Sequence, residues 1–148
     1  MQVCITVVSA CNLIRSEGKA PNKPFVVLYE QIDNNRRNKK KTRVGKMAEQ
    51  SNHFAFNECF IVDLAEDSPE SKINFCVYDK QVLKKCTVGR TFFDFAGICC
   101  EQGHVINLHL QLIDSTNAGL NIQIKPLNFS IGKKENACHT LLDRVSAS

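Results

Sequence analysis

The chain has 148 residues, of which 43% are hydrophobic and 23% charged, a length and composition that suit one globular domain. No window approaches the roughly 18 apolar residues of a membrane-spanning helix, so no transmembrane segment is predicted. The net charge of +4 is local: residues 36–46 hold seven basic residues and no acid, leaving 12 basic against 15 acidic residues elsewhere. This segment therefore marks one basic surface.

Eight cysteines stand at positions 4, 11, 59, 76, 86, 99, 100 and 138. They lack the paired spacing of a zinc site, and a chain of this length needs no covalent staples. Three of them, Cys4, Cys59 and Cys76, lie in apolar runs, where free cysteine behaves as a small hydrophobic residue. We expect reduced thiols and a cytoplasmic protein, either free or attached peripherally to a membrane.

Short runs of β-branched and aromatic residues recur along the chain between turn signals, and long helical periodicity is absent. In chain order, the predicted strands are residues 3–7, 25–29, 40–44, 54–62, 73–77, 88–93, 105–112 and 120–124. Each has one clear alternating face, and the run 40–44 is a polar strand. The pattern predicts an all-β fold, an eight-stranded antiparallel β-sandwich over residues 1–129. Residues 130–148 form a polar C-terminal tail, for which docking on the domain and docking on a partner both stay open.

These strands carry a family pattern. The opening VCITVVSACNL followed by PNKPFVVLY is similar to the first two strands of C2 domains, which are calcium- and lipid-binding β-sandwiches. Downstream, the segments KTRV, FAFNECF, INFCVYD, TVGRTFF and GLNIQI resemble later strands of the family in the same order and spacing. The chain therefore resembles a C2 domain over residues 1–129, with the permuted topology of novel-type protein kinase C and phospholipase members.

The resemblance also locates a calcium site and shows that its ligands are mostly replaced. The matching positions are Glu17 and Lys23 on one loop, and Asp79, Gln81 and Cys86 on another. Calcium takes 6–8 oxygen ligands, whereas only two of these five positions keep a carboxylate. A lysine charge about 4 Å from the ion would cost about 4 kcal/mol per unit charge at an effective dielectric near 20. We expect no calcium, other metal or cofactor.

The same loops are basic instead, with an apolar tip. The residues concerned are Lys19, Lys23, Lys80, Val82, Leu83, Lys84 and Lys85. In several calcium-independent members of the family, basic loops with apolar tips contact anionic membranes. The loop end is therefore a candidate membrane contact, and solvated loop lysines are the alternative.

The basic segment is the second candidate, comprising Arg36, Arg37, Lys39, Lys40, Lys41, Arg43 and Lys46. In family members the concave face at this place binds phosphoinositides or other anionic lipid. Strand alternation predicts that Lys39, Lys41 and Arg43 share one face, with Lys40 and Thr42 on the other. A solvated charged edge is the alternative. Nucleic acid is not an expected partner, because no aromatic residue interleaves with these cations to stack bases.

No enzymatic motif is present: the chain has no phosphate loop, no GxSxG and no HExxH sequence. We therefore expect a non-enzymatic peripheral membrane-binding adaptor that recognises anionic phospholipid without calcium. The alternative is a protein–protein assembly module, a cytoskeletal or trafficking scaffold that binds its partner through the basic face or the tail.

Overall fold

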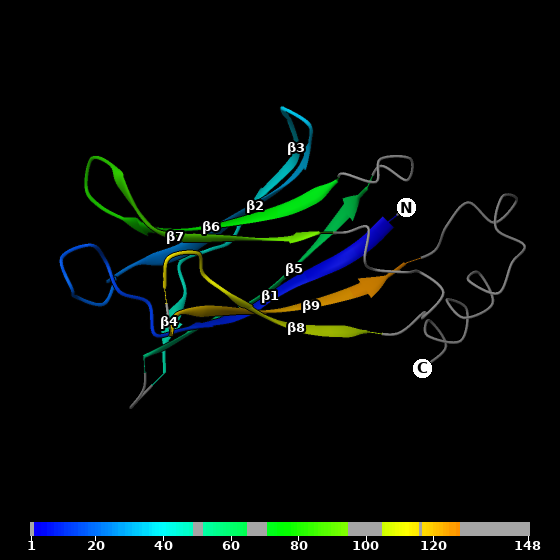
Figure 1. Cartoon of the computed structure of the whole chain (residues 1–148). Coiled ribbons are helices and arrows are strands. Elements are labelled where there is room, and N and C mark those ends of the chain that lie inside the picture. Colours follow the sequence, from blue (N-terminus) through cyan, green and yellow to red (C-terminus); the bar gives the residue numbers. More distant parts are fainter. Residues whose placement is uncertain (1, 49–51, 65–70, 95–104, 116, 128–148) are drawn as a thin grey trace, which may run out of the picture.

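The computed structural model describes residues 2–48, 52–64, 71–94, 105–115 and 117–127. These residues form nine strands and no helix, in two antiparallel sheets that pack face to face (Figure 1). No helix among them is long and apolar enough to span a bilayer. The predicted tail, residues 130–148, lies outside the described residues.

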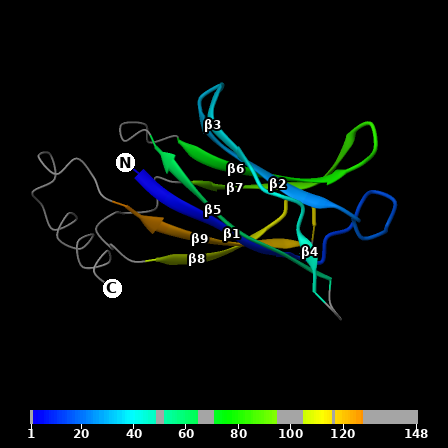
Figure 2. The same ribbon diagram turned by 180° about the vertical axis from the view of Figure 1, so that it is seen from behind.

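The five-stranded sheet has the order β4 (Lys46–Met47), β5 (His53–Asp63), β1 (Gln2–Cys11), β9 (Gly119–Pro126) and β8 (Ile106–Gln111). The four-stranded sheet has the order β3 (Asn35–Lys41), β2 (Pro24–Ile32), β6 (Lys72–Lys80) and β7 (Lys85–Asp94). Figure 2 shows the two layers from behind; β2 and β6 are the inner strands of one sheet, and β1, between β5 and β9, is the central strand of the other. The all-β sandwich expected from the sequence is confirmed.

The core lies between the sheets and follows the alternation of the strands. Residues Val3, Ile5 and Val7 of β1 are fully buried, in one cluster with Phe75 and Val77 of β6. Alternate residues of a strand point to opposite faces, so one apolar residue in two is enough to cover the inner face. Full burial of each such side chain stabilises the fold by about 1.5–3 kcal/mol.

One strand differs from its expected position. The run 40–44 was expected to pair, whereas β3 spans Asn35–Lys41 and a further short strand, β4, follows it. Ile32 pairs with Asn35 across a tight turn, in which Asp33 has a φ of 53°, so pairing begins earlier. The strand ends before Thr42, where the Thr42 amide still donates to the Val26 carbonyl at 2.8 Å but the Val26 amide donates to the Thr42 hydroxyl, at 2.9 Å, in place of a backbone carbonyl.

Strand β2 is buried on both faces. On its outer side, Phe25, Val27 and Tyr29 form a second apolar cluster with Cys76 and Tyr78 of β6. We call this outer surface of the four-stranded sheet the aromatic face. Its rings are not part of the core, and they lie beside the basic strand β3.

A buried carboxylate fixes β3 against β2. Glu30, 1% exposed, accepts the Arg37 Nε at 2.8 Å and the Asn38 Nδ2 at 3.1 Å, and Ser71 donates its hydroxyl to the other oxygen at 3.2 Å. Asn38 has a φ of 58° at an irregularity in the pairing, and it also donates to the Asp63 carbonyl at 2.9 Å. A buried charge is tolerated only when it is paired in this way.

The cysteine prediction was wrong for one pair. A disulfide joins Cys4 of β1 to Cys59 of β5, with the two Cα atoms 6.2 Å apart. Both residues alternate with neighbours that are buried or half-buried and therefore point away from the core, which places their sulfurs together on the outer face of the five-stranded sheet. Among the described residues Cys11, Cys76 and Cys86 are free thiols.

Arg37→Ala should lower the free energy of unfolding by about 2 kcal/mol, since it removes the guanidinium that pairs with buried Glu30. The loss is smaller than for a fully buried pair because the Arg37 side chain is half-exposed. Urea denaturation followed by circular dichroism measures it. The matched control Arg36→Ala removes an exposed arginine of the same strand and should cost under about 1 kcal/mol. Equal losses for the two variants would contradict the role given to Glu30.

Candidate functional site

Three rings form the centre of the aromatic face. Phe25 and Tyr78 pack with their centroids 5.6 Å apart and their planes inclined by 33°, and Tyr29 follows Phe25 on the same side of β2. Ring pairs at such distances attract each other through offset or tilted contacts. The three rings therefore form one packed apolar surface on the aromatic face.

A cation from a neighbouring strand covers each of these rings. The Arg36 guanidinium lies 4.8 Å from the Tyr29 centroid, and the Lys41 ammonium lies 4.7 Å from that of Phe25. Lys85 of β7 lies 4.1 Å from the centroid of Tyr78. Each contact contributes about 0.5–1 kcal/mol at an exposed site, which is enough to bias the position of a long side chain. The positive charges are thus held above the face, two from β3 and one from β7.

A hollow of about 530 Å³ lies on this face. Its lining residues are Tyr29, Gln31, Arg36, Asn74, Cys76, Tyr78, Thr87 and Arg90. None of them is acidic, and two are arginines. The Asn74 amide donates to the Gln31 side-chain oxygen at 2.9 Å, which orients both amides. Guanidinium, amide and hydroxyl groups around a shallow hollow suit an anion with several oxygens.

The two phenols on this face have raised pKa values. Burial raises the pKa of Tyr29 above its ordinary value, and the neighbouring Cys76 raises it further, while Arg36 acts in the opposite direction. Burial also raises the pKa of Tyr78, again with a contribution from Cys76. A phenol is neutral at physiological pH even at its ordinary pKa, and the raised pKa keeps both hydroxyls protonated into more basic solution.

The structure separates the seven basic residues of segment 36–46. Arg36 and Lys41 lie on the aromatic face, whereas Arg37 contacts Glu30 at the buried edge. Arg43 lies beyond the end of β3, and its Nε is 3.6 Å from a carboxylate oxygen of Glu58 in the five-stranded sheet. The other three are Lys39, which is exposed, Lys40, which is half-buried opposite Leu28, and Lys46, which is in β4.

Sequence reasoning missed the part of the aromatic face that comes from other strands. Tyr29 and Tyr78 were assigned to apolar strands, and Arg90 of β7 was not singled out. The signal was present in β2, where Phe25 to Tyr29 has apolar residues at consecutive positions. Such a run predicts burial on both faces, and hence a surface beyond the core.

The predicted loops do come together at one end of the sandwich. The β1–β2 loop, residues 12–23, and the β6–β7 loop, residues 81–84, project from the same end (Figures 1 and 2). The Lys80 amide donates to the Lys23 carbonyl at 2.9 Å, joining them. A hollow of about 750 Å³ lies here, lined by Arg15, Asn22, Lys23, Asp79, Lys80, Gln81, Val82, Leu83 and Lys84.

The apolar tip is exposed as predicted. Val82 is 98% exposed and Leu83 96% exposed. The turn beneath them is closed by the Gln81 amide, which donates to the Lys84 carbonyl at 2.8 Å. Lys19, Lys23, Lys80, Lys84 and Lys85 are exposed as well. Two adjacent apolar side chains therefore stand in solvent among lysines.

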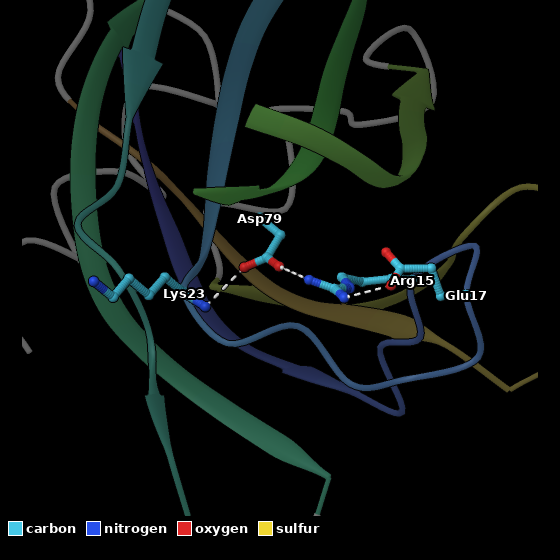
Figure 3. Close-up of polar contacts among 4 residues, drawn as sticks. All are labelled: Arg15, Glu17, Lys23 and Asp79. Carbon is cyan, nitrogen blue, oxygen red and sulfur yellow. Dashed lines mark hydrogen bonds and ion pairs between the residues drawn. The ribbon is translucent and has the colours of Figure 1, made fainter. Parts of the chain in front are cut away.

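An arginine lies between the two carboxylates at the expected calcium positions (Figure 3). The Arg15 Nη1 is 3.0 Å from Asp79 Oδ2, and its Nη2 is 2.9 Å from Glu17 Oε2. Asp79 is 1% exposed, so the ion pair compensates a buried charge. The hydrogen bond to Asp79 raises the pKa of Arg15 above its ordinary value.

The sequence argument about Lys23 was wrong in its physical reason. The contact with Asp79 Oδ1 comes from the Lys23 backbone N–H, at 2.8 Å, and the Lys23 side chain extends away from the carboxylate (Figure 3). Gln81 belongs to the tight turn, and Cys86 pairs opposite Asp79 in the β6–β7 ladder. Both oxygens of Asp79 are therefore engaged within the chain. The described residues contain no cluster of three metal-binding side chains, and this arrangement does not fit a calcium ion.

The family assignment follows from sequence. The sequence model of the C2 domain family matches residues 1–112 of the 148, so the chain belongs to the C2 domain family. The match ends before β9, which completes the five-stranded sheet. Comparison with curated protein sequences gives no match.

Solved structures share the fold at low identity. A C2 domain of plant extended synaptotagmin 1 is 21% identical with a TM-score of 0.63, covering 86% of this chain and 96% of that one. Human GIVD cytosolic phospholipase A2 is 15% identical with a TM-score of 0.64, covering 86% of this chain but 16% of that one. The calcium-bound pair of C2 domains from extended synaptotagmin 2 is 15% identical with a TM-score of 0.63, covering 84% and 44%. The likeness shows the fold alone.

The phenols of the folded protein should titrate above pH 10, because burial raises the pKa of both Tyr29 and Tyr78 from 10.0. Phenolate absorbance reports these two residues directly, since the chain has two tyrosines and no tryptophan. A folded-state pKa above the unfolded value gives stability that is present below pH 10 and lost as the pH rises through the folded pKa.

The control for this titration is the protein unfolded in guanidinium chloride, whose phenols should titrate near 10. Tyr29→Phe then assigns the remaining transition to Tyr78. A folded-state midpoint at or below the unfolded one would contradict the burial of the rings.

Proposed function

We propose that this C2 domain is a non-enzymatic peripheral module that binds anionic phospholipid surfaces without calcium. The aromatic face carries the proposal: Arg36, Lys41 and Lys85 lie above its rings, and Arg90 lines the adjoining hollow. Phosphate groups could be bound there by cations that are already in place. Localisation at the cytoplasmic side of a membrane stays a prediction, and the Cys4–Cys59 disulfide removes the thiol argument for it.

The charge available suits reversible attachment. Each basic residue near an anionic leaflet contributes about 1 kcal/mol, and the effect falls off within a Debye length. Four cations on the aromatic face would therefore give an affinity that weakens strongly with salt. The cation–π contacts reduce the side-chain freedom lost on binding, because three of the four cations are already positioned.

The loop tip supplies a second, apolar contact. Val82 and Leu83 are almost fully exposed at the end of the sandwich, with Lys80 and Lys84 on either side. Moving Leu83 from water into the acyl boundary would contribute about 1.5–3 kcal/mol, comparable to two or three lipid-facing lysines. Phosphate-binding lysines around an apolar tip are suited to the interface of a bilayer.

Arg36→Glu combined with Lys41→Glu should weaken binding to anionic vesicles at least roughly tenfold and leave the thermal midpoint nearly unchanged, since both side chains are exposed. Co-sedimentation with phosphatidylcholine vesicles, with and without phosphatidylserine, measures the affinity. Tyrosine fluorescence gives a local readout, because both tyrosines lie on the aromatic face.

The matched control is Lys46→Glu with Lys125→Glu, which changes the net charge equally but alters only the five-stranded sheet. It should bind nearly as the wild type does. Equal weakening of both double variants would mean that total charge alone matters. Unchanged binding of the Arg36/Lys41 variant would make the basic strand a solvated edge and favour the protein-assembly alternative.

Leu83→Asp should also weaken vesicle binding roughly tenfold, because an inserted side chain is replaced by a charge that cannot enter the acyl region. Ile61→Asp is the control, since Ile61 is 60% exposed and lies on the five-stranded sheet, away from the loops. A fluorophore placed at position 83 should shift to the blue only with anionic vesicles. A fluorophore that stays in water on the vesicle-bound protein would rule out insertion.

A further inference from the structure

The loop end contains two carboxylates at positions where calcium-binding relatives would have metal ligands, and both contact an arginine of this chain. Asp79 is almost fully buried at the end of β6, and Glu17 lies on the β1–β2 loop. Two carboxylates that approach each other repel unless a cation lies between them. The group between them is the guanidinium of Arg15 (Figure 3).

We propose that Arg15 is a built-in substitute for the divalent cation of the loop end. Its positive charge compensates Asp79 and Glu17, and it holds the β1–β2 loop on the end of β6 without any ion. The proposal deepens the calcium independence of the proposed function by assigning that independence to one residue. It does not require lipid binding, because the ion pair exists whether or not the loops meet a membrane.

The geometry of the guanidinium fits this role. Its two terminal nitrogens contact carboxylates from two segments, Nη1 at 3.0 Å from Asp79 and Nη2 at 2.9 Å from Glu17. A planar group with two donor arms can join two carboxylates at once, as a metal ion does, whereas a lysine ammonium is a single point charge. The Arg15 side chain is only 15% exposed, so solvent screens the contact with buried Asp79 weakly.

Backbone contacts connect this ion pair to the shape of the loop. The second oxygen of Asp79 accepts the Lys23 amide at 2.8 Å, and the Lys23 carbonyl accepts the Lys80 amide at 2.9 Å. Arg15 itself closes the other part of the loop, because its amide donates to the Lys19 carbonyl at 2.7 Å and its carbonyl accepts the Gly18 amide at 2.8 Å. Asp79 is thus contacted by both parts of the β1–β2 loop.

The contact between Lys23 and Asp79 does not involve the lysine charge. The Lys23 side chain extends away from Asp79, and the contact with the carboxylate is made by the backbone. If Arg15 provides the compensating charge, loss of that charge should leave two carboxylates that attract a divalent cation. Asn22 and Gln81, which also line the hollow, could add amide oxygens to such a weak site.

The experiment measures thermal midpoints of the full chain with and without about 10 mM CaCl₂, a concentration above the range of weak calcium modules, against KCl of equal ionic strength. The variants are Arg15→Gln, Arg15→Gln with Asp79→Asn, and Arg43→Gln, which removes an exposed arginine from another ion pair. The wild type and Arg43→Gln should not respond to calcium. Arg15→Gln should melt several degrees lower and regain at least about 2 °C in calcium.

The double variant should be more stable than Arg15→Gln and should not respond to calcium, because it has no buried charge to compensate. Arg15→Lys keeps the charge with one nitrogen, and it should melt between the wild type and Arg15→Gln. If Arg15→Gln does not fold, Arg15→Lys still tests the proposal. A thermal midpoint equal to that of the wild type would mean that one nitrogen is enough, and it would overturn the two-armed role of Arg15.

Two further outcomes would overturn the proposal. One is an Arg15→Gln variant that gains no more from CaCl₂ than from KCl, which would make Arg15 an ordinary ion-pair partner. The other is a calcium response of the wild type below about 100 µM that Asp79→Ala abolishes. The first outcome leaves the proposed membrane function to its own vesicle test, whereas the second would also contradict the calcium independence of that function.

Discussion

Burial of β2 on both faces is the constraint on which the rest of the structure depends. Its inner residues Val26 and Leu28 complete the core, and its outer residues Phe25, Val27 and Tyr29 form the aromatic face. A central strand flanked by β3 and β6 leaves its outer residues next to the side chains of both neighbours. The cations of β3 therefore pack on aromatic rings, and the basic strand acquires a defined geometry that charge alone would not give it.

Two buried carboxylates position the candidate binding surfaces. Glu30 holds β3 through Arg37 and Asn38, which leaves Arg36 directed to the aromatic face. Asp79 holds the β1–β2 loop through Arg15 and the Lys23 amide. In both cases an arginine that resembles a surface residue in the sequence compensates an internal acid. The number of basic residues in a segment thus overstates how many can meet a ligand.

Alternation along the strands made the fold and the core predictable, because the inner face of a sheet requires an apolar residue at every second position. The candidate site was predictable where it follows strand and loop order, as for Lys41, Val82 and Leu83. Arg37 was not, because an irregularity at Asn38 changes which residues face inward. The Cys4–Cys59 pairing was missed because partners in different strands depend on sheet order. Arg15 was missed because it occupies none of the positions aligned with calcium ligands.

The contact between Lys23 and Asp79 does not depend on which side chain stands at position 23. Since the backbone N–H makes the hydrogen bond, position 23 can hold any residue except proline, which lacks that donor. Position 15 has no such freedom, because its side chain supplies the charge. In chains descended from a common ancestor with this one, residues 15 and 79 should therefore change together, while residue 23 drifts. Charge compensation in this loop therefore depends on positions 15 and 79 together, and only position 79 of the two is aligned with a calcium ligand.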